Sequence, residues 1–104
     1  MMKTRIQNSP ALMAVFERIS RERLRQRALM RAGKISFACE SPIVGDDRKL
    51  RVLVEEVGEV AQALDHLERA TARGRVFARE DLQTELVQVA AVACAWLEAL
   101  ENEK

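Results

Sequence analysis

Residues 54–64, VEEVGEVAQAL, place three glutamates inside an apolar run. At about 100° of rotation per residue, the apolar side chains here fall within one quadrant of a helix, which predicts the side that faces the core. This predicted core stripe consists of Leu53, Val57, Val60, Leu64 and Leu67. Glu56 borders the stripe, and Glu59 and Glu55 lie further out along the same edge. Carboxylates beside a core are costly unless they reach solvent or are compensated.

A second stretch repeats this layout. The segment ELVQVAAVACAW, which begins at Glu85, aligns without a gap with EVGEVAQALDHL, which begins at Glu56. Glu85 takes the place of Glu56, and Gln88 that of Glu59, so each predicted helix carries a polar pair at i and i+3 beside its apolar stripe. Because the connection between them is short, we expect an antiparallel hairpin in which the two polar pairs face each other.

The rest of the chain extends this helical pattern. Glycine and proline are scarce, while Ala, Leu, Glu and Arg dominate the stretches between them, which is typical of an all-α fold. We predict a single domain over residues 1–104, with helices at about 10–32, 48–73 and 79–100. Ser9 as N-cap and Pro10 mark the start of the first helix, and Gly33 marks its end.

Several residues refine these boundaries and the packing. Asp46 or Asp47 is expected to cap the second helix, and Glu80 is expected in the first turn of the third. Gly58 lies inside the second helix, where glycine costs about 1 kcal/mol relative to alanine, so we expect another backbone to approach it closely. Trp96, on the stripe of the third helix, is expected in the core rather than as a stacking platform.

Composition excludes several classes of protein. The chain has 17 basic and 16 acidic residues, a formal charge of +1 and few aromatic residues, which argues against nucleic acid as a partner. No apolar run approaches the roughly 20 residues of a membrane span, and the N-terminus MMKTRIQNSP lacks the apolar stretch of a signal peptide. We therefore expect no membrane partner and a cytoplasmic location. A 104-residue chain has a large surface for its volume, so self-association would help it.

The two polar pairs suggest a metal site. Four oxygen-bearing side chains converging from facing helices are what Mg²⁺ requires, and helix bundles build metal sites in this way. A cation would also offset the repulsion between neighbouring carboxylates. In the alternative interpretation there is no metal, and Glu55 and Glu59 are solvated or paired with Arg51 and His66.

The stretch EEVGEVAQAL, followed by ELVQVAAVACAWLEAL, resembles the MazG-like all-α nucleoside triphosphate pyrophosphohydrolases. The signature of that family is ExxE on one helix and ExxD on the next. Glu56 and Glu59 match the first half, and Glu85 and Gln88 match the second. The resemblance covers roughly residues 47–100.

The resemblance implies an enzyme that hydrolyses a (deoxy)nucleoside triphosphate to the monophosphate and pyrophosphate, as in nucleotide-pool housekeeping. It implies Mg²⁺, or Mn²⁺ in its place, held by Glu56, Glu59, Glu85 and the position of Gln88, with Glu55 orienting or deprotonating the attacking water. It also implies a dimer or tetramer in which a four-helix-bundle-like core is completed between subunits.

Gln88 departs from the family pattern, which has aspartate at this position. A glutamine keeps a carbonyl oxygen but removes one negative charge, which weakens a charge-dependent site. The alternative function is therefore a catalytically weakened MazG-like oligomer that binds nucleotide or a protein partner.

Basic residues supply candidates for phosphate binding. Lys34 and Lys49 border the segment before the second helix, where a phosphate would lie above the metal. The second half of the first helix is rich in arginine, and we expect most of these arginines to be solvated or paired with acids such as Glu17 and Glu22.

Overall fold

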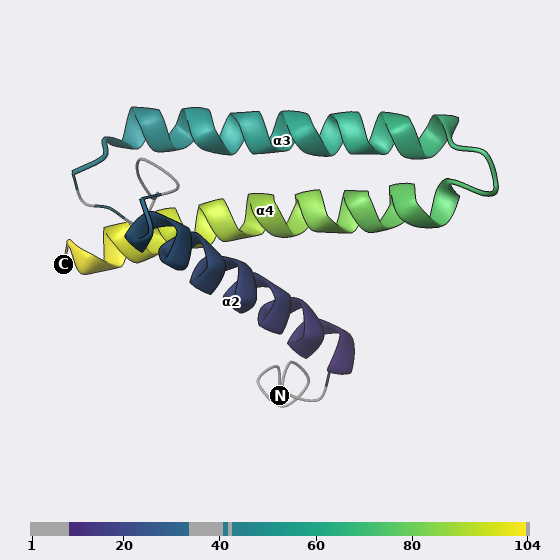
Figure 1. The fold of residues 1–104 in the computed structure, drawn as a ribbon. Coiled ribbons are helices and arrows are strands. Elements are labelled where there is room, and N and C mark those ends of the chain that lie inside the picture. The colour runs from purple at the N-terminus through teal and green to yellow at the C-terminus, as the bar shows by residue number, and fades with distance from the viewer. Residues whose placement is uncertain (1–8, 34–40, 42, 104) are drawn as a thin grey trace.

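The structure is a computed structural model, and it describes residues 9–33, 41 and 43–103. These residues form three helices and no strand, which confirms the all-α prediction. The helices are α2 (Pro10–Arg31), α3 (Asp46–Arg69) and α4 (Arg75–Asn102) (Figure 1). None of them is long and apolar enough to cross a membrane.

The ends of α2 are those that the sequence predicts. The Ser9 hydroxyl accepts a hydrogen bond from the backbone N–H of Leu12 at 3.3 Å, and Pro10 occupies the first helical position. The helix stops at Ala32, and Gly33 follows with a φ of +71°, in the left-handed region that favours glycine. Ser9 therefore caps the N-terminus of α2, and Gly33 ends the helix, as their residue types predict.

The start of α3 differs from the prediction that an aspartate caps it. Gly45 is the N-cap and makes no side-chain hydrogen bond, while Asp46 and Asp47 lie inside the first turn. There they stabilise the helix through its dipole, because a negative charge is favourable near a helix N-terminus.

The connection between the last two helices also differs. α3 ends at Arg69, earlier than predicted, and α4 begins at Arg75, so the segment RVFARED is helical rather than a connection. Gly74 is the N-cap of α4, and the segment after it contains no residue that breaks a helix. Glu80 consequently lies beyond the first turn.

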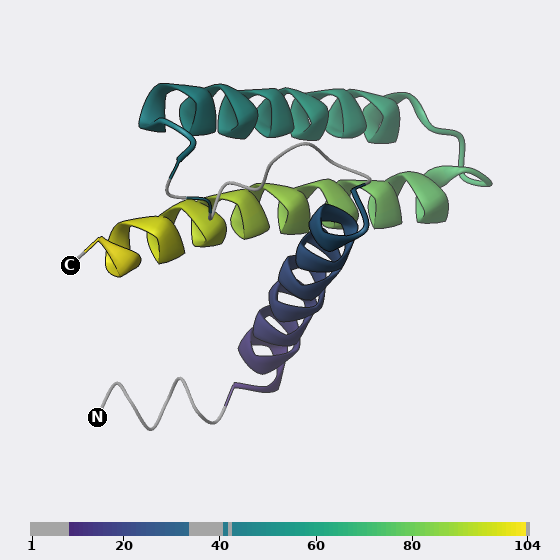
Figure 2. The same cartoon turned by 60° about the vertical axis from the view of Figure 1, so that its left-hand side comes forward.

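The three helices are arranged around α4. α3 and α4 run antiparallel and side by side, which confirms the predicted hairpin, and α2 crosses α4 at an angle (Figures 1 and 2). In the described part of the chain, α2 packs against α4, and its backbone does not come close to the backbone of α3. α4 is therefore the element that holds the other two.

The core is small and rich in alanine. Its buried apolar residues are Ala63, Leu67, Ala78, Ala91, Val92, Ala95 and Ala99. Val92 and Ala95 form its centre, with Val52 and Leu53 packed against them. Small side chains on α4 let neighbouring helices approach closely, but they bury little apolar area. Because burial of apolar surface stabilises a fold by about 25 cal/mol per Å², this core contributes little stability for its number of residues.

The predicted core stripe of α3 is only partly correct. Leu67 is buried and Leu53 and Val60 are partly buried, whereas Val57 and Leu64 remain about half exposed. The reason is that α4 covers only one edge of a wide apolar surface. The other edge carries a stripe exposed to solvent, the outer stripe, which consists of Leu50, Val54, Val57, Ala61 and Leu64.

Gly58 does not have the close neighbour that the sequence suggests. Outside its own helix backbone, a Cβ added at this residue would meet no heavy atom of the described residues within 4 Å, and Gly58 is exposed. The expectation of a close backbone approach is therefore wrong for the single chain.

An ionic cluster attaches α2 to α4. Arg23 is only 4% exposed, and its guanidinium reaches both Glu98 on α4 and the Gln26 side chain, the latter at 2.8 Å. Arg27 lies 3.1 Å from the same Glu98 oxygen. Burial alone would raise the pKa of Glu98, but the hydrogen bonds and charges of the two arginines outweigh it and hold the pKa below its ordinary value.

A hydrogen bond joins the two helices of the hairpin at the end away from their connection. The indole N–H of Trp96 donates to the carboxylate of Asp46 at 2.8 Å, which ties the C-terminal half of α4 to the first turn of α3. Trp96 is partly buried rather than enclosed in the core, because its N–H needs a polar partner at the surface.

Candidate active site

Glutamates from both helices of the hairpin form an acidic cluster. α3 supplies Glu56 and Glu59, and α4 supplies Glu85 from the opposite side. Burial raises the pKa of Glu56 above its ordinary value, and the negative charges of Glu85, Glu59, Glu22 and Glu55 raise it further. The charges of two polar helix edges therefore meet across the hairpin, as the repeated spacing predicts.

Glu85 behaves in the same way on the other helix. Burial raises its pKa, and the charges of Glu59 and Asp81 add to the effect. Both partly buried acids are thus harder to ionise than a solvated carboxyl, and a bound cation is one way to reverse this.

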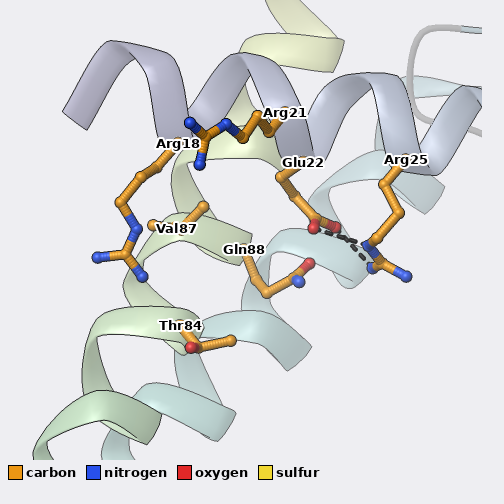
Figure 3. A pocket seen from close by; sticks show the side chains of 7 residues that line it. All are labelled: Arg18, Arg21, Glu22, Arg25, Thr84, Val87 and Gln88. Atoms are coloured by element: carbon orange, nitrogen blue, oxygen red, sulfur yellow. Dashed lines mark hydrogen bonds and ion pairs between the residues drawn. The ribbon is translucent and has the colours of Figure 1, made fainter. Parts of the chain in front are cut away.

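Gln88 faces a residue that the sequence analysis did not select. Its amide lies beside the carboxylate of Glu22, which projects from α2 (Figure 3). The side chain of Glu22 is only 10% exposed. Glu22 thus brings a carboxylate next to the position where the family pattern has an aspartate.

A paired arginine keeps Glu22 ionised. Arg25 donates to its two carboxylate oxygens from Nε at 2.8 Å and from Nη2 at 2.7 Å (Figure 3). Burial alone would raise the pKa of Glu22, but the hydrogen bonds and charge of Arg25, with the nearby amide of Gln88 and a hydrogen bond from Gln26, hold it below its ordinary value. The sequence shows this pair only as an i, i+3 ion pair on α2, which is common on helix surfaces.

The donor chemistry of the cluster suits a hard divalent cation. Glu56, Glu59 and Glu85 offer carboxylate oxygens, and Gln88 offers an amide oxygen. Among the described residues, however, no three acidic, histidine or cysteine side chains are arranged to hold one metal ion. To share an ion, these side chains would have to change rotamer, which takes picoseconds to nanoseconds for exposed residues.

The remaining predicted site residues lie apart from this cluster or outside the described chain. Glu55 is exposed and lines a separate hollow of about 490 Å³ beside Asp47 and Arg51. Lys49 lies inside α3, two turns before Glu56, and is only 2% exposed. Lys34 falls outside the described residues.

Comparisons with known proteins add no relative to these observations. No protein-family model, curated protein or solved structure matches this chain. The assignment of a function therefore rests on the site itself.

Proposed function

We propose that the chain is a Mg²⁺-dependent nucleoside triphosphate pyrophosphohydrolase of the MazG-like type. The observation that carries this proposal is the acidic cluster across the hairpin, in which burial and neighbouring negative charges raise the pKa of Glu56 and Glu85. Acids brought together from facing helices at a cost in electrostatic energy are typical of sites for divalent cations and phosphate substrates.

Glu56, Glu59 and Glu85 would hold the cation, with the amide oxygen of Gln88 as a neutral donor. Such a cation neutralises charge on the triphosphate and polarises its phosphoryl groups. Glu55 lines a separate hollow in the structure, so it would have to turn toward the cluster to accept the proton of the water whose oxygen attacks the α-phosphorus. The bond from that phosphorus to the bridging oxygen then breaks, and pyrophosphate leaves.

Gln88 favours a second function, that of a catalytically weakened relative which binds nucleotide or a protein partner. The neutral amide leaves the cluster with three carboxylates, and the nearby carboxylate of Glu22 is engaged by Arg25. A site with fewer available negative charges binds Mg²⁺ less strongly.

Pyrophosphate release distinguishes the two functions. We would assay the purified protein against canonical and modified (deoxy)nucleoside triphosphates with Mg²⁺, with Mn²⁺ and with chelator. For the enzyme we expect metal-dependent release that is lost in Glu56→Gln and retained in Glu68→Gln, a matched change at an exposed acid of the same helix. No release from any substrate, with release restored by Gln88→Asp, would instead establish the weakened relative.

We further propose that the chain associates with a second copy through the outer stripe of α3. Its residues repeat with spacings of four, three, four and three, which is the heptad pattern of a seam between two helices. Such a seam needs a partner helix with the same pattern, and α3 of another copy provides one. The side chains of Leu50, Val54, Val57 and Leu64 are 44–60% exposed in the single chain, so this surface is accessible to a partner.

A further inference from the structure

A pocket of about 220 Å³ lies where α2 crosses α4 (Figure 3). Residues of both helices line it, and they are Arg18, Arg21, Glu22, Arg25, Thr84, Val87 and Gln88. Gln88 and Glu22 line the side of the pocket that is nearest to the acidic cluster. The negative charge of Glu22 is close enough to Glu56 to contribute to its raised pKa. The pocket is not one of the sites that the sequence pattern selects.

The charges around this pocket favour an anion. Arg18, Arg21 and Arg25 are spaced i, i+3 and i+7, which puts them on one face of α2. Arg21 pairs with Glu17 outside the pocket, and Arg25 pairs with Glu22. Arg18 makes no ion pair with any residue that the structure describes. Guanidinium groups match the geometry of phosphate oxygens and bind them with two parallel hydrogen bonds.

The size of the pocket limits what it takes. Pockets that enclose a whole drug-sized ligand measure about 300–1,000 Å³, so this one fits the phosphates of a nucleotide but not its nucleoside. An adjoining pocket of about 310 Å³ shares Arg18 and Val87 with it. Its other lining residues are mostly apolar, and they are Val15, Ile19, Gln83, Leu86 and Ala90.

We propose that these two pockets form one groove along the α2–α4 crossing that binds a nucleoside triphosphate, a ligand class that rests on the function proposed above. The phosphate chain lies among Arg18, Arg21 and Arg25, and the nucleoside lies against Ile19 and Leu86. The phosphates then end beside the acidic cluster, at Gln88. The groove is therefore a candidate phosphate-binding site on α2, in addition to Lys34 and Lys49, which the sequence suggests.

Binding without turnover tests the groove. We would titrate the full chain, with Mg²⁺ and with chelator, with inorganic tripolyphosphate and with the α,β-imido analogues of dUTP and dATP, which are not cleaved at that bond. The double variant Arg18→Gln/Arg21→Gln should bind all three at least tenfold more weakly, because each lost charged contact is worth about tenfold. Arg73→Gln, a matched change on the connection between α3 and α4, should bind them as the wild type does.

A second variant separates the two halves of the groove. Leu86→Gln should weaken the two analogues about threefold and leave tripolyphosphate unchanged, because Leu86 lines only the apolar half. Leu86 is half exposed, so this change should not unfold the chain. Equal weakening of all three ligands would contradict the division of the groove.

The remaining outcomes separate this proposal from the proposed function. The proposal of a groove is overturned if tripolyphosphate binds equally well to the wild type and to the double arginine variant. It is also overturned if that variant turns over substrate with an unchanged KM. Neither result contradicts the proposed enzymatic function. Binding that depends on the arginines, without pyrophosphate release from any substrate, supports the groove and overturns the enzyme. Tighter binding of a single-stranded oligonucleotide through the same arginines shows a nucleic-acid site instead and overturns the groove.

Discussion

The electrostatics of single residues divide the acids of this protein into two groups. Glu56 and Glu85 have raised pKa values, because burial and negative neighbours act on them in the same direction. Glu22 and Glu98 have lowered pKa values, because arginines overcome the effect of burial. The first pair therefore favours a bound cation, while the second pair already has its cations in the fold.

Replacement of Glu56 by glutamine should stabilise the protein in the absence of divalent cations. The raised pKa means that the folded state holds the proton more tightly than the unfolded state. The stability that this provides is fully present below the ordinary carboxyl pKa and is lost as pH rises through the raised value. At neutral pH we expect Glu56→Gln to increase the free energy of unfolding by about 0.5 kcal/mol, the size of a like-charge repulsion on a helix. Urea denaturation in chelator between pH 4 and 8 measures this.

Glu68→Gln is the control for this experiment, since Glu68 is exposed on the same helix. Addition of Mg²⁺ should remove the advantage of Glu56→Gln, because the cation stabilises only the chain with the carboxylate. A less stable variant in chelator would show that Glu56 has a favourable partner and is not repelled.

At this scale the sequence predicted the cluster but not its surroundings. Glu56, Glu59 and Glu85 could be found because they follow a helical repeat on two adjacent helices. Glu22 could not, because its proximity to Gln88 depends on the place where α2 crosses α4, and that crossing leaves no periodic signal in the sequence. Lys49 was expected beside a phosphate near the start of the second helix, but α3 begins two residues earlier than predicted and Lys49 is only 2% exposed.

Among the elements, α2 depends most on a few contacts. In the described part of the chain it packs on α4, and the cluster of Arg23, Arg27 and Glu98 joins the two helices across more than 70 residues of sequence. Apolar contacts contribute less here, because Val15 and Phe16 on α2 remain about half exposed. The attachment of this helix is therefore largely ionic.

Glu98→Gln should loosen α2. The change removes the carboxylate that Arg23 and Arg27 share, and we expect a loss of roughly 2 kcal/mol in the free energy of unfolding. The lowered pKa of Glu98 gives the same sign, because its stabilising effect is present above the ordinary carboxyl pKa and is lost as pH falls through the lowered value. Thermal unfolding at pH 7 would measure the loss, with the exposed Glu103→Gln as the control. An unchanged melting temperature would contradict an ionic attachment.

Gly58→Ala should stabilise α3. Alanine is preferred over glycine inside a helix by about 0.5–1 kcal/mol, and outside the helix backbone no described residue has a heavy atom within 4 Å of the added Cβ. Chemical denaturation at low protein concentration would show this gain. A loss of stability that appears only at high concentration would mean that another copy packs against this glycine.

Helix boundaries were predicted best where a residue type acts through local backbone geometry alone. Ser9, Pro10 and Gly33 act through local backbone geometry, so the limits of α2 were readable. The limits of α3 and α4 were not, because Gly74 precedes a stretch that is equally compatible with a turn and with a helix. Packing of Ala78 against the hairpin favours the helix.

At the scale of the whole molecule, one surface of α3 lacks a packing partner among the residues that the structure describes. The outer stripe lies about 100° around the helix from the side that faces α4, as the rotation per residue requires. The sequence pattern predicts both sides as one core stripe, because periodicity reveals the width of an apolar surface but not which part of it a neighbouring helix covers. A chain with so few large buried side chains gains stability if a second copy covers the rest.

Val57→Asp should therefore shift the protein toward the monomer. A carboxylate in the middle of the outer stripe would be buried without a partner in a dimer, which is strongly unfavourable. Light scattering coupled to size-exclusion chromatography over a concentration series measures the mass. Val76→Asp, the same change at an exposed valine on α4 outside the stripe, is the control. A wild type that stays monomeric at every concentration would contradict association through α3.

The attachment of α2 to α4 also has a consequence for molecular recognition. Both walls of the groove exist together only while α2 is docked, because one wall is α2 and the other is α4. Each undocking event therefore abolishes the pocket, and the apparent affinity for any ligand in it is reduced by the fraction of time that α2 spends undocked. A ligand that bridges the two helices shifts this equilibrium toward the docked state, so the N-terminal helix would exchange its amide hydrogens more slowly when the groove is filled.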